Sequence, residues 1–494
     1  MKRTIFLSLI VLASVCAVAA PKKQKAPVLT KQDVLATATL VNRWFMNYCP
    51  DPTLDTHVGG KTRPSSLWTR GVYYEGLMAL YQMDPQEAYY DYTLRWCDYH
   101  QWMPRNGVTT RDADDYCCCQ TYIDMYRIQK ARGMKRGEGL ADLSKVIEHA
   151  KMITRLQEND DWWWIDAIQM GMPVLYKLSR TTGDKRYAAK AWQMYEYTRN
   201  LQDGGLRNSV NGLWWRDRNF NPPFKTPGGK DCYWSRGDGW VVAALCRVLD
   251  EMQPTDPHYR EYVFDLTELL NGLLPLQRED LFWNCSLADP TDFGGKEVTG
   301  TSLFIYGYAW CVNHDILPAD QYRPLIENTW RAMVKECVHA DGMLGYQQGT
   351  GKEPKDSQPT LYDKLPDFDD FGIGCFLLCA SEVYKMVNVF MRREAFKMYL
   401  LPGQKEEYRR RHANLFPELR RLLSESGVRN YSIYLDEDTN TLYAYQELEG
   451  DGGSQDLGAT EICQSWWAYM ADIMVTNPDH SPVSVPLPEM FHMD

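Results

Sequence analysis

The sequence has no surplus of positive charge and few histidines. It contains 54 Lys and Arg against 65 Asp and Glu, which gives a net charge of −11, and only nine of its 494 residues are His. Phosphate binding needs a concentrated positive surface, so we expect no nucleic-acid partner. An acidic protein can still bind an anionic sugar if a few Arg or Lys side chains line the pocket.

Long hydrophobic runs are absent after the first residues, so we expect no membrane span. Residues 1–20 read MKRTIFLSLIVLASVCAVAA, in which Lys2 and Arg3 precede an apolar run and Ala17-Val18-Ala19 offers a cleavage site. This pattern is typical of a secretory signal peptide and predicts an exported, periplasmic protein. Cys16 leaves lipoprotein anchoring as an alternative, which the bulky residue before it disfavours.

The spacing of the 14 cysteines does not indicate a zinc site. Cys117, Cys118 and Cys119 are adjacent, so they cannot readily bond to each other or bind one metal ion. Export permits disulfides, but buried thiols in helices explain these residues more simply. We therefore expect no metal and no other cofactor.

Strand-like alternation is scarce between residues 30 and 390, where helical periodicity dominates. One kind of segment recurs there: a polar or aromatic cluster followed by an apolar helix rich in small residues. The six examples begin at Leu67, Asp114, Trp162, Tyr233, Val298 and Asp369. We interpret each as the inner helix of a hairpin, with the polar clusters at a common mouth. The pattern predicts an all-α (α/α)6 barrel, and an irregular helical array is the alternative.

Acidic residues at two of these clusters are candidates for catalysis. Asp166 follows Trp-Trp-Trp-Ile, where large apolar neighbours exclude water and favour the protonated carboxyl that a general acid requires. Asp115 follows Asp114 ahead of an apolar helix. For Asp114 or Asp115, a role as a helix N-cap is an equally good explanation.

Arg236 and two tryptophans are candidates for binding an acidic sugar. Arg236 lies between Trp234 and Trp240, beside glycines that leave space. A guanidinium there suits a planar carboxylate, and an ion pair with Asp238 explains the pattern equally well. Trp68 and Trp240 are candidates for stacking on a sugar ring.

The segments WTRG, ADDYC, WxxDAxxM, LWWRD and WSRGDGW together resemble the unsaturated rhamnogalacturonyl hydrolases, glycoside hydrolase family 105. The resemblance covers roughly residues 30–390 and implies an (α/α)6 barrel. In that family an Asp protonates C4 of a 4,5-unsaturated galacturonic acid, water adds at C5, and the hemiketal collapses to release the neighbouring sugar. Trp214-Trp215, where many relatives have His, and Cys119, where Gly is usual, depart from the pattern.

The resemblance also implies roles for individual residues. It makes Asp166 the general acid/base and Asp115 the second carboxylate of the pocket. It places Arg236 and Trp240 against the uronate and gives Trp68 a stacking role.

After Met386 the pattern changes to β-α-β-β-α. REAFKMYLLP alternates like a strand, and Gln404 to Ser426 reads as one amphipathic helix despite Pro417. NYSIYLDEDTNTLYAYQELE then reads as two strands, and CQSWWAYMADIM as a helix. This order predicts a second domain at residues 391–494, a small α+β ferredoxin-like fold of the dimeric α/β barrel type.

EEYRRRH, NYSIYLD, CQSWWAYM and NPDHSPVS in this second domain closely resemble L-rhamnose mutarotase. That family interconverts the anomers of L-rhamnose by opening and closing the pyranose ring. The resemblance makes His412 the group that protonates the ring oxygen, since imidazole titrates near neutrality. It adds Tyr408, Tyr431, Trp466 and Trp467 to the pocket. A homodimer formed through this domain is a further hypothesis.

The two resemblances agree with one another. Cleavage of an unsaturated galacturonosyl–rhamnose disaccharide releases free L-rhamnose, which a mutarotase would equilibrate, so the expected partners are the oligosaccharide and L-rhamnose. One alternative is an unsaturated glucuronyl hydrolase for another lyase-derived glycan. A sugar epimerase would need paired histidines, which the six clusters lack, and a non-catalytic glycan-binding protein would not need Asp166.

Overall fold

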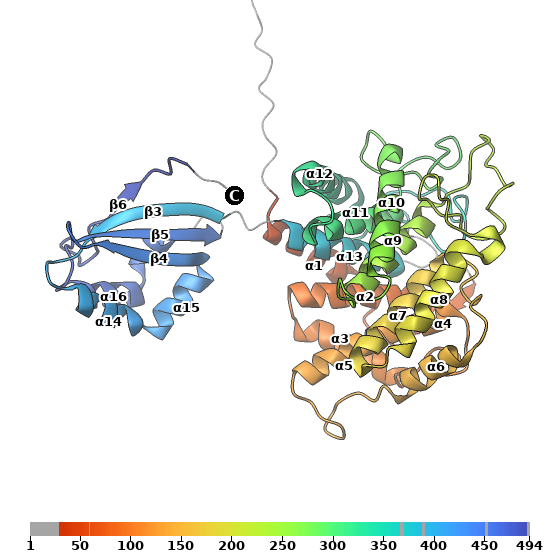
Figure 1. The fold of residues 1–494 in the computed structure, drawn as a ribbon, viewed down its shortest axis with the longest axis horizontal. Helices are drawn as coiled ribbons and strands as arrows, with labels where there is room; N and C mark the ends of the chain where they lie inside the picture. The colour runs from red at the N-terminus through yellow and green to blue at the C-terminus, as the bar shows by residue number, and fades with distance from the viewer. Residues whose placement is uncertain (1–28, 59, 366–369, 388–390, 450–452, 492–494) are drawn as a thin grey trace, which may run out of the picture.

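The computed structural model describes residues 29–58, 60–365, 370–387, 391–449 and 453–491. Residues 31–386 form a helical body, and residues 391–487 form a smaller body of strands and helices (Figure 1). The predicted signal peptide, with Cys16, lies outside the described residues. Within them, no helix combines the length and apolar character that a membrane crossing requires.

Six helices of the larger body pack in succession. They are α2 (Trp68–Met83), α5 (Cys119–Ala131), α7 (Asp166–Thr182), α9 (Ser235–Leu249), α11 (Val298–Asn313) and α13 (Asp370–Met386). Each packs against the next, and α13 packs back against α2. They correspond to the six recurring apolar segments, and most of their side chains are buried.

The other helices of this body precede the inner ones or lie between them in the chain. They are α1 (Lys31–Tyr48), α3 (Glu87–Tyr99), α4 (Ala113–Tyr116), α6 (Ser144–Arg155), α8 (Arg186–Asn200), α10 (Tyr259–Leu273) and α12 (Ala319–Cys337). They are amphipathic: α6, for example, buries Val146, His149, Ala150 and Ile153, which share one helical face. A short hairpin joins β1 (Thr56–Val58) to β2 (Lys61–Arg63).

Glycines allow the inner helices to approach closely, as the small residues of these segments predict. Gly76 of α2 lies against Gly374 of α13, and a methyl group at Gly76 would sit 2.5 Å from the Gly374 carbonyl oxygen. Any side chain at this position would therefore push the two backbones apart.

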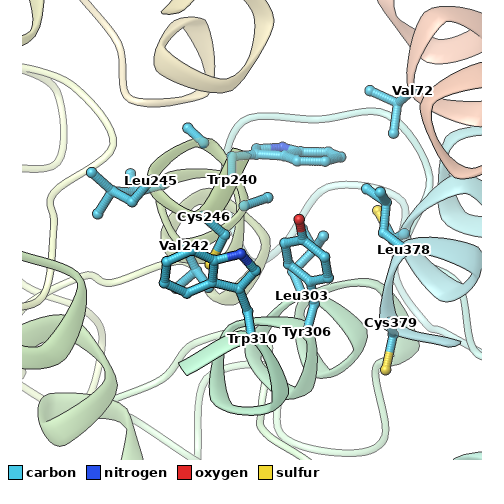
Figure 2. Close-up of a cluster of buried hydrophobic side chains, with 14 of the residues drawn as sticks. Val72, Trp240, Val242, Leu245, Cys246, Leu303, Tyr306, Trp310, Leu378 and Cys379 are labelled. Carbon is cyan, nitrogen blue, oxygen red and sulfur yellow. The ribbon is translucent and has the colours of Figure 1, made fainter. Parts of the chain in front are cut away.

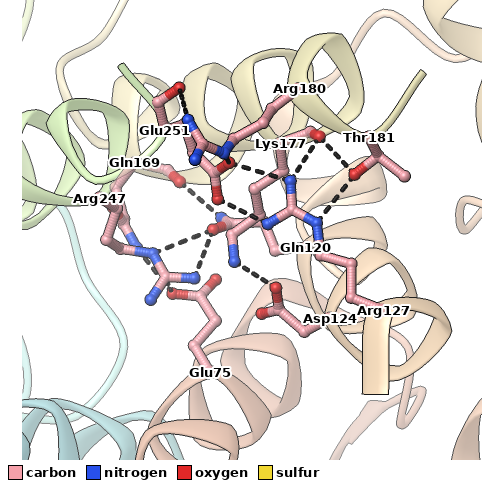
Figure 3. Close-up of polar contacts among 10 residues, drawn as sticks. All are labelled: Glu75, Gln120, Asp124, Arg127, Gln169, Lys177, Arg180, Thr181, Arg247 and Glu251. Carbon is pink, nitrogen blue, oxygen red and sulfur yellow. Dashed lines mark hydrogen bonds and ion pairs between the residues drawn. The ribbon is translucent and has the colours of Figure 1, made fainter. Parts of the chain in front are cut away.

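A buried polar network links four of the inner helices (Figure 3). Glu75 of α2 accepts a hydrogen bond of 2.7 Å from Gln169 of α7. Arg247 of α9 lies 3.6 Å from the same carboxylate and donates to Gln120 of α5 at 2.8 and 3.1 Å. Because each partner comes from a different helix, the network fixes the helices relative to one another.

The smaller body is an α+β domain with a four-stranded antiparallel sheet of order β4-β5-β3-β6. The strands are β3 (Met391–Tyr399), β4 (Val428–Asp436), β5 (Thr441–Glu449) and β6 (Val485–Leu487). The helices are α14 (Lys405–Ala413), α15 (Pro417–Glu425) and α16 (Glu461–Met470). Alternate strand residues, including Phe396, Met398, Leu442 and Ala444, share a core with Trp466 of α16.

The prediction of one helix from Gln404 to Ser426 is wrong. The chain forms α14 and α15 there, and Pro417 is the first residue of α15. Proline has no N–H to donate and clashes with the preceding turn, so it begins a helix more readily than it continues one. The short strand β6 was also not predicted.

Candidate functional sites

Asp166 begins α7 and is only 8% exposed. The Nε atom of Arg216 lies 2.9 Å from its Oδ2, and the same guanidinium pairs with Asp217 at 2.6 Å. Trp163 lies beside this cation, with its ring centroid 5.8 Å from the guanidinium carbon. The predicted general acid therefore has a cationic partner as well as tryptophan neighbours.

Asp114 of α4 belongs to the same electrostatic site. Burial raises the pKa of Asp114 to about 8, and the negative charges of Asp112 and Asp166 act in the same direction. Arg216 and Arg105 oppose this rise with smaller effects. Asp114 thus stays protonated at neutral pH, while Asp166 is paired with a cation.

Asp115 points into a different set of contacts. Its carboxylate accepts hydrogen bonds from Thr110 at 2.5 Å and Asn106 at 3.1 Å, and it pairs with Arg105. These contacts tie the loop before α4 to the Asp115 carboxylate. Consecutive residues of a helical turn point in different directions, and it is Asp114 on which the charge of Asp166 acts. The helix N-cap is neither of them but Asp112, which accepts from the Asp114 backbone N–H at 3.0 Å.

Arg236 is completely buried near the start of α9. Its Nη1 and Nη2 atoms donate to the carbonyl oxygens of Gln348 and Gly349, both at 2.7 Å. The ring centroids of Trp234 and Phe371 lie 4.5 and 5.0 Å from the guanidinium carbon.

The alternative ion pair between Arg236 and Asp238 does not form. The Asp238 carboxylate accepts a hydrogen bond from the Trp214 backbone N–H instead. Arg236 therefore holds the loop at Gln348 and Gly349, and its guanidinium is not exposed to solvent.

Trp68 and Trp240 contact each other edge to face, with ring centroids 6.2 Å apart. Trp240 is buried within the apolar core shown in Figure 2, whereas Trp68 is partly exposed. Trp68 also packs on Phe371 at 5.2 Å, and Phe371 in turn touches Arg236. Of the two rings, Trp68 is therefore the one that solvent reaches, and Trp240 contacts it from the core.

These residues occupy corresponding positions in different helices. Trp68 and Asp166 are the first residues of α2 and α7, and Arg236 is the second residue of α9. The charge of Asp166 also acts on Arg236. Trp68, Asp166 and Arg236 thus lie at the N-terminal ends of three inner helices, whereas Asp115 lies in α4 and Trp240 lies further along α9.

The second candidate site is a cavity of about 1030 Å3 in the α+β domain. All five predicted residues line it: Tyr408, His412, Tyr431, Trp466 and Trp467. They come from α14, β4 and α16. The aromatic rings of this lining suit the apolar face of a deoxysugar.

His412 has a defined environment in this cavity. Its ring stacks on Tyr408 with centroids 4.2 Å apart and meets Trp466 edge to face at 5.3 Å. Burial lowers the pKa of His412 below its usual value. Its Nδ1 lies 3.2 Å from the Tyr408 carbonyl oxygen. A carbonyl can only accept, so Nδ1 carries the proton and Nε2 of the neutral ring has a free lone pair.

Two family models match this chain. The model described as Glycosyl Hydrolase Family 88 matches residues 37–387, and the model described as L-rhamnose mutarotase matches residues 393–493. The chain belongs to glycosyl hydrolase family 88 and carries an L-rhamnose mutarotase domain.

Relatives support both assignments. The family 88 region is 28% identical over 340 residues to an unsaturated 3S-rhamnoglycuronyl hydrolase from Formosa agariphila, covering 65% of this chain and 84% of that protein. A solved structure of a family 88 glycosyl hydrolase from Bacteroides vulgatus superposes with a TM-score of 0.64 at 28% identity, covering 72% of this chain and all of that one. The mutarotase domain is 67% identical over 104 residues to the L-rhamnose mutarotase of Bacteroides thetaiotaomicron, covering 21% of this chain and all of that protein.

The family 105 resemblance has a structural counterpart. A possible member of that family from Salmonella enterica superposes with a TM-score of 0.56 at 18% identity, covering 73% of this chain and 96% of that one. At this identity the superposition shows a shared fold.

Sequence reasoning missed Arg216 as a site residue of the family 88 domain. Its signal was the LWWRD segment, in which Arg216 and Asp217 follow two tryptophans. Charged residues beside a buried aromatic pair indicate a desolvated ion pair. Its ion-pair partner Asp166 lies 50 positions earlier, so local sequence patterns do not predict the contact between the two residues.

The cysteines of the described residues are thiols, and all but Cys49 are buried. Within the same ranges, no three His, Cys, Asp or Glu side chains are grouped as a metal ion would need.

Proposed function

We propose that the family 88 domain removes a 4,5-unsaturated uronic acid from L-rhamnose by hydrating the C4–C5 double bond. The observation that carries this proposal is the pair formed by Asp114 and Asp166: burial and the charge of Asp166 raise the pKa of Asp114, and Asp166 itself is ion-paired with Arg216. The rhamnoglycuronyl hydrolases of Formosa agariphila and an Alteromonas species support a uronyl–rhamnose substrate by their names.

Asp114, whose pKa is raised to about 8, carries a proton at neutral pH, and acid-catalysed hydration requires such a proton. Asp166 acts at the reacting carbons and delivers the proton to C4, as its position at the head of α7 suggests. Asp114 holds that proton in the free protein and passes it to Asp166. Water then adds at C5 and returns a proton to the pair, and the hemiketal opens to release rhamnose. Arg216 stabilises the carboxylate whenever the proton is on the other group.

Arg236 and Trp68 have supporting roles in this proposal. Trp68 stacks on the bound sugar, and Trp240 supports it. Arg236 holds the loop at Gln348 and Gly349 against the site through its two hydrogen bonds.

The C-terminal domain equilibrates the anomers of L-rhamnose. Neutral His412 accepts the proton of the anomeric hydroxyl at Nε2 as the C1–O5 bond breaks, and it delivers that proton to the ring oxygen. Ring closure on the other face of C1 reverses these steps. The stacked ring of Tyr408 and the edge contact with Trp466 fix the imidazole for this transfer.

We also propose the finer architecture and the location. The cyclic packing from α2 to α13 and back supports an (α/α)6 barrel over residues 30–390. The β-α-α-β-β-α-β order supports a ferredoxin-like fold for residues 391–494. The leader at residues 1–20 supports export to the periplasm. Light scattering tests the homodimer, and a monomeric mass would end that hypothesis.

Ultraviolet absorbance of the conjugated double bond tests the hydrolase. We expect the wild-type protein to abolish the absorbance of lyase-treated rhamnogalacturonan and to release L-rhamnose. Unchanged absorbance would contradict this substrate. Lyase products of another glycan that carry an unsaturated uronyl group on rhamnose form the second arm, because a relative is named unsaturated 3S-rhamnoglycuronyl hydrolase. Activity there alone would assign the alternative glycan, and activity on neither would overturn the hydrolase proposal.

A further inference from the structure

The cavity of the mutarotase domain is larger than one neutral monosaccharide requires. Its volume of about 1030 Å3 lies at the top of the ~300–1,000 Å3 found for small-molecule sites. The contacting rings of Tyr408, His412 and Trp466 form only part of its lining. The rest of the lining extends over α15, β4 and the chain after α16.

Basic side chains dominate the charged part of this lining. Lys405, Tyr408, Arg409 and His412 share one face of α14, because they recur at helical spacing, and all four line the cavity. Arg420 of α15 also lines it. The aromatic and catalytic groups thus lie on the same helix face as cations that a neutral sugar does not need.

Little negative charge balances these cations. Among the described residues of the lining, Glu437 is the acidic one, and it pairs with Lys405. Arg409 meets Glu406 at 3.5 Å, in a pair whose side chains are 70% and 77% exposed. Such an exposed ion pair contributes little to stability, and Arg409 can readily exchange Glu406 for another carboxylate. Arg420 is exposed, and the described part of the chain provides no ion pair for it. Arg409 and Arg420 can therefore take an external carboxylate.

We propose that this domain also interconverts the anomers of a rhamnose that is still the reducing end of an acidic oligosaccharide. The inference rests on the proposed mutarotase activity. Only C1, O1 and O5 take part in ring opening, so a uronyl group on another hydroxyl leaves the chemistry unchanged. One proton moves from O1 to O5 as the C1–O5 bond breaks, and it returns on closure. The uronate lies beside Arg409 and Arg420 of the lining, whose charges attract it.

The test uses the full chain with Asp166→Asn, which keeps an unsaturated uronyl–rhamnose disaccharide intact. Anomer exchange is measured by NMR magnetisation transfer for this disaccharide and for free L-rhamnose. We expect the protein to accelerate both, and His412→Ala to abolish both. The double substitution Arg409→Ala/Arg420→Ala should lower the disaccharide rate relative to the rhamnose rate by about fivefold. The control is Arg421→Ala, which changes a neighbouring exposed arginine outside the lining and should leave this ratio unchanged.

The outcomes separate the two proposals. Acceleration of L-rhamnose exchange without acceleration of disaccharide exchange overturns this inference and leaves the mutarotase intact. No acceleration of either overturns the mutarotase proposal itself. If the disaccharide is accelerated but the double substitution leaves the ratio unchanged, the arginines do not recognise the uronate and that part of the inference is overturned.

Discussion

At the scale of single residues, neighbouring carboxyl groups in one helical turn have different environments. Asp115 is surrounded by donors that stabilise its negative charge, whereas Asp114 is desolvated and faces the charges of Asp112 and Asp166. The environment of a carboxyl group, more than its position in the sequence, therefore sets its pKa.

The raised pKa of Asp114 makes the free energy of unfolding depend on pH. The pKa is 3.8 in the unfolded reference and about 8 in the folded protein. The folded state therefore binds the extra proton, and this stabilisation is present below pH 3.8 and lost as the pH rises through about 8. Asp114→Asn removes the titration, so we expect its Tm to exceed that of the wild type by about 2 °C or more at pH 9.

Thermal unfolding at pH 5 and pH 9 measures this effect. At pH 5 the difference in Tm between Asp114→Asn and the wild type should be smaller or of opposite sign. A difference that is independent of pH would contradict the environment described for Asp114. Asp115→Asn is the matched control, and it should lower the Tm at both values because it weakens the contacts of the loop before α4.

The lowered pKa of His412 has a consequence for mutarotation. Its usual value is 6.5, and burial shifts the folded value downward, so the neutral ring persists below pH 6.5. We expect the enzymatic rate to be flat from neutrality down to pH 6.5 and to fall only in more acidic solution. Polarimetry on a freshly dissolved anomer, corrected for buffer catalysis, gives the midpoint of the acid limb. A midpoint at or above 6.5 would contradict the buried position of this ring.

At the scale of elements, the positions of the six inner helices along the chain were predictable and their side-chain partners were not. The starts of the six inner helices follow from local hydrophobic patterns. Tyr408 and His412 lie one turn apart, so their contact follows from helical spacing as well. Arg236 finds its acceptors 112 and 113 positions away, and Asp166 finds Arg216 50 positions away. Such pairings depend on how the hairpins close, which local sequence does not encode.

The buried network around Glu75 should be important for the packing of the inner helices. Glu75→Ala removes the carboxylate that faces Arg247 and leaves that cation with Gln120 in a buried environment. Breaking one side of a buried pair costs about 3–5 kcal/mol. We therefore expect urea unfolding of the helical domain to show a loss of about that size.

An exposed ion pair provides the control for this prediction. Lys145 and Glu148 lie on α6 with side chains 50% and 54% exposed. Lys145→Ala should change the free energy of unfolding by less than about 0.5 kcal/mol. If Glu75→Ala had an equally small effect, the network would not hold the helices together.

At the scale of the whole molecule, two enzymes share one chain. L-rhamnose mutarotases of about the length of the C-terminal domain occur as separate proteins, since the match covers all of the Bacteroides thetaiotaomicron relative. The active residues of the two domains have no sequence segment in common. The chain therefore links the release of a deoxysugar to the equilibration of its anomers.

Separate inactivation tests this division. We expect Asp166→Asn to abolish loss of the double bond while L-rhamnose exchange continues. His412→Ala should have the reverse effect. Both activities are measured on each purified variant, with circular dichroism to verify folding. A folded variant that lost both activities would contradict two independent sites.

The most direct measurement of the central claim compares Asp114→Asn, Asp166→Asn and Asp115→Asn by the rate at which the double bond disappears. If Asp114 and Asp166 share the transferable proton, the first two variants should lose about 10²–10⁴-fold in rate, as expected for general acid–base groups. Asp115→Asn should keep most of its activity while it remains folded. Near-normal activity of Asp114→Asn together with an inactive, folded Asp115→Asn would contradict the account.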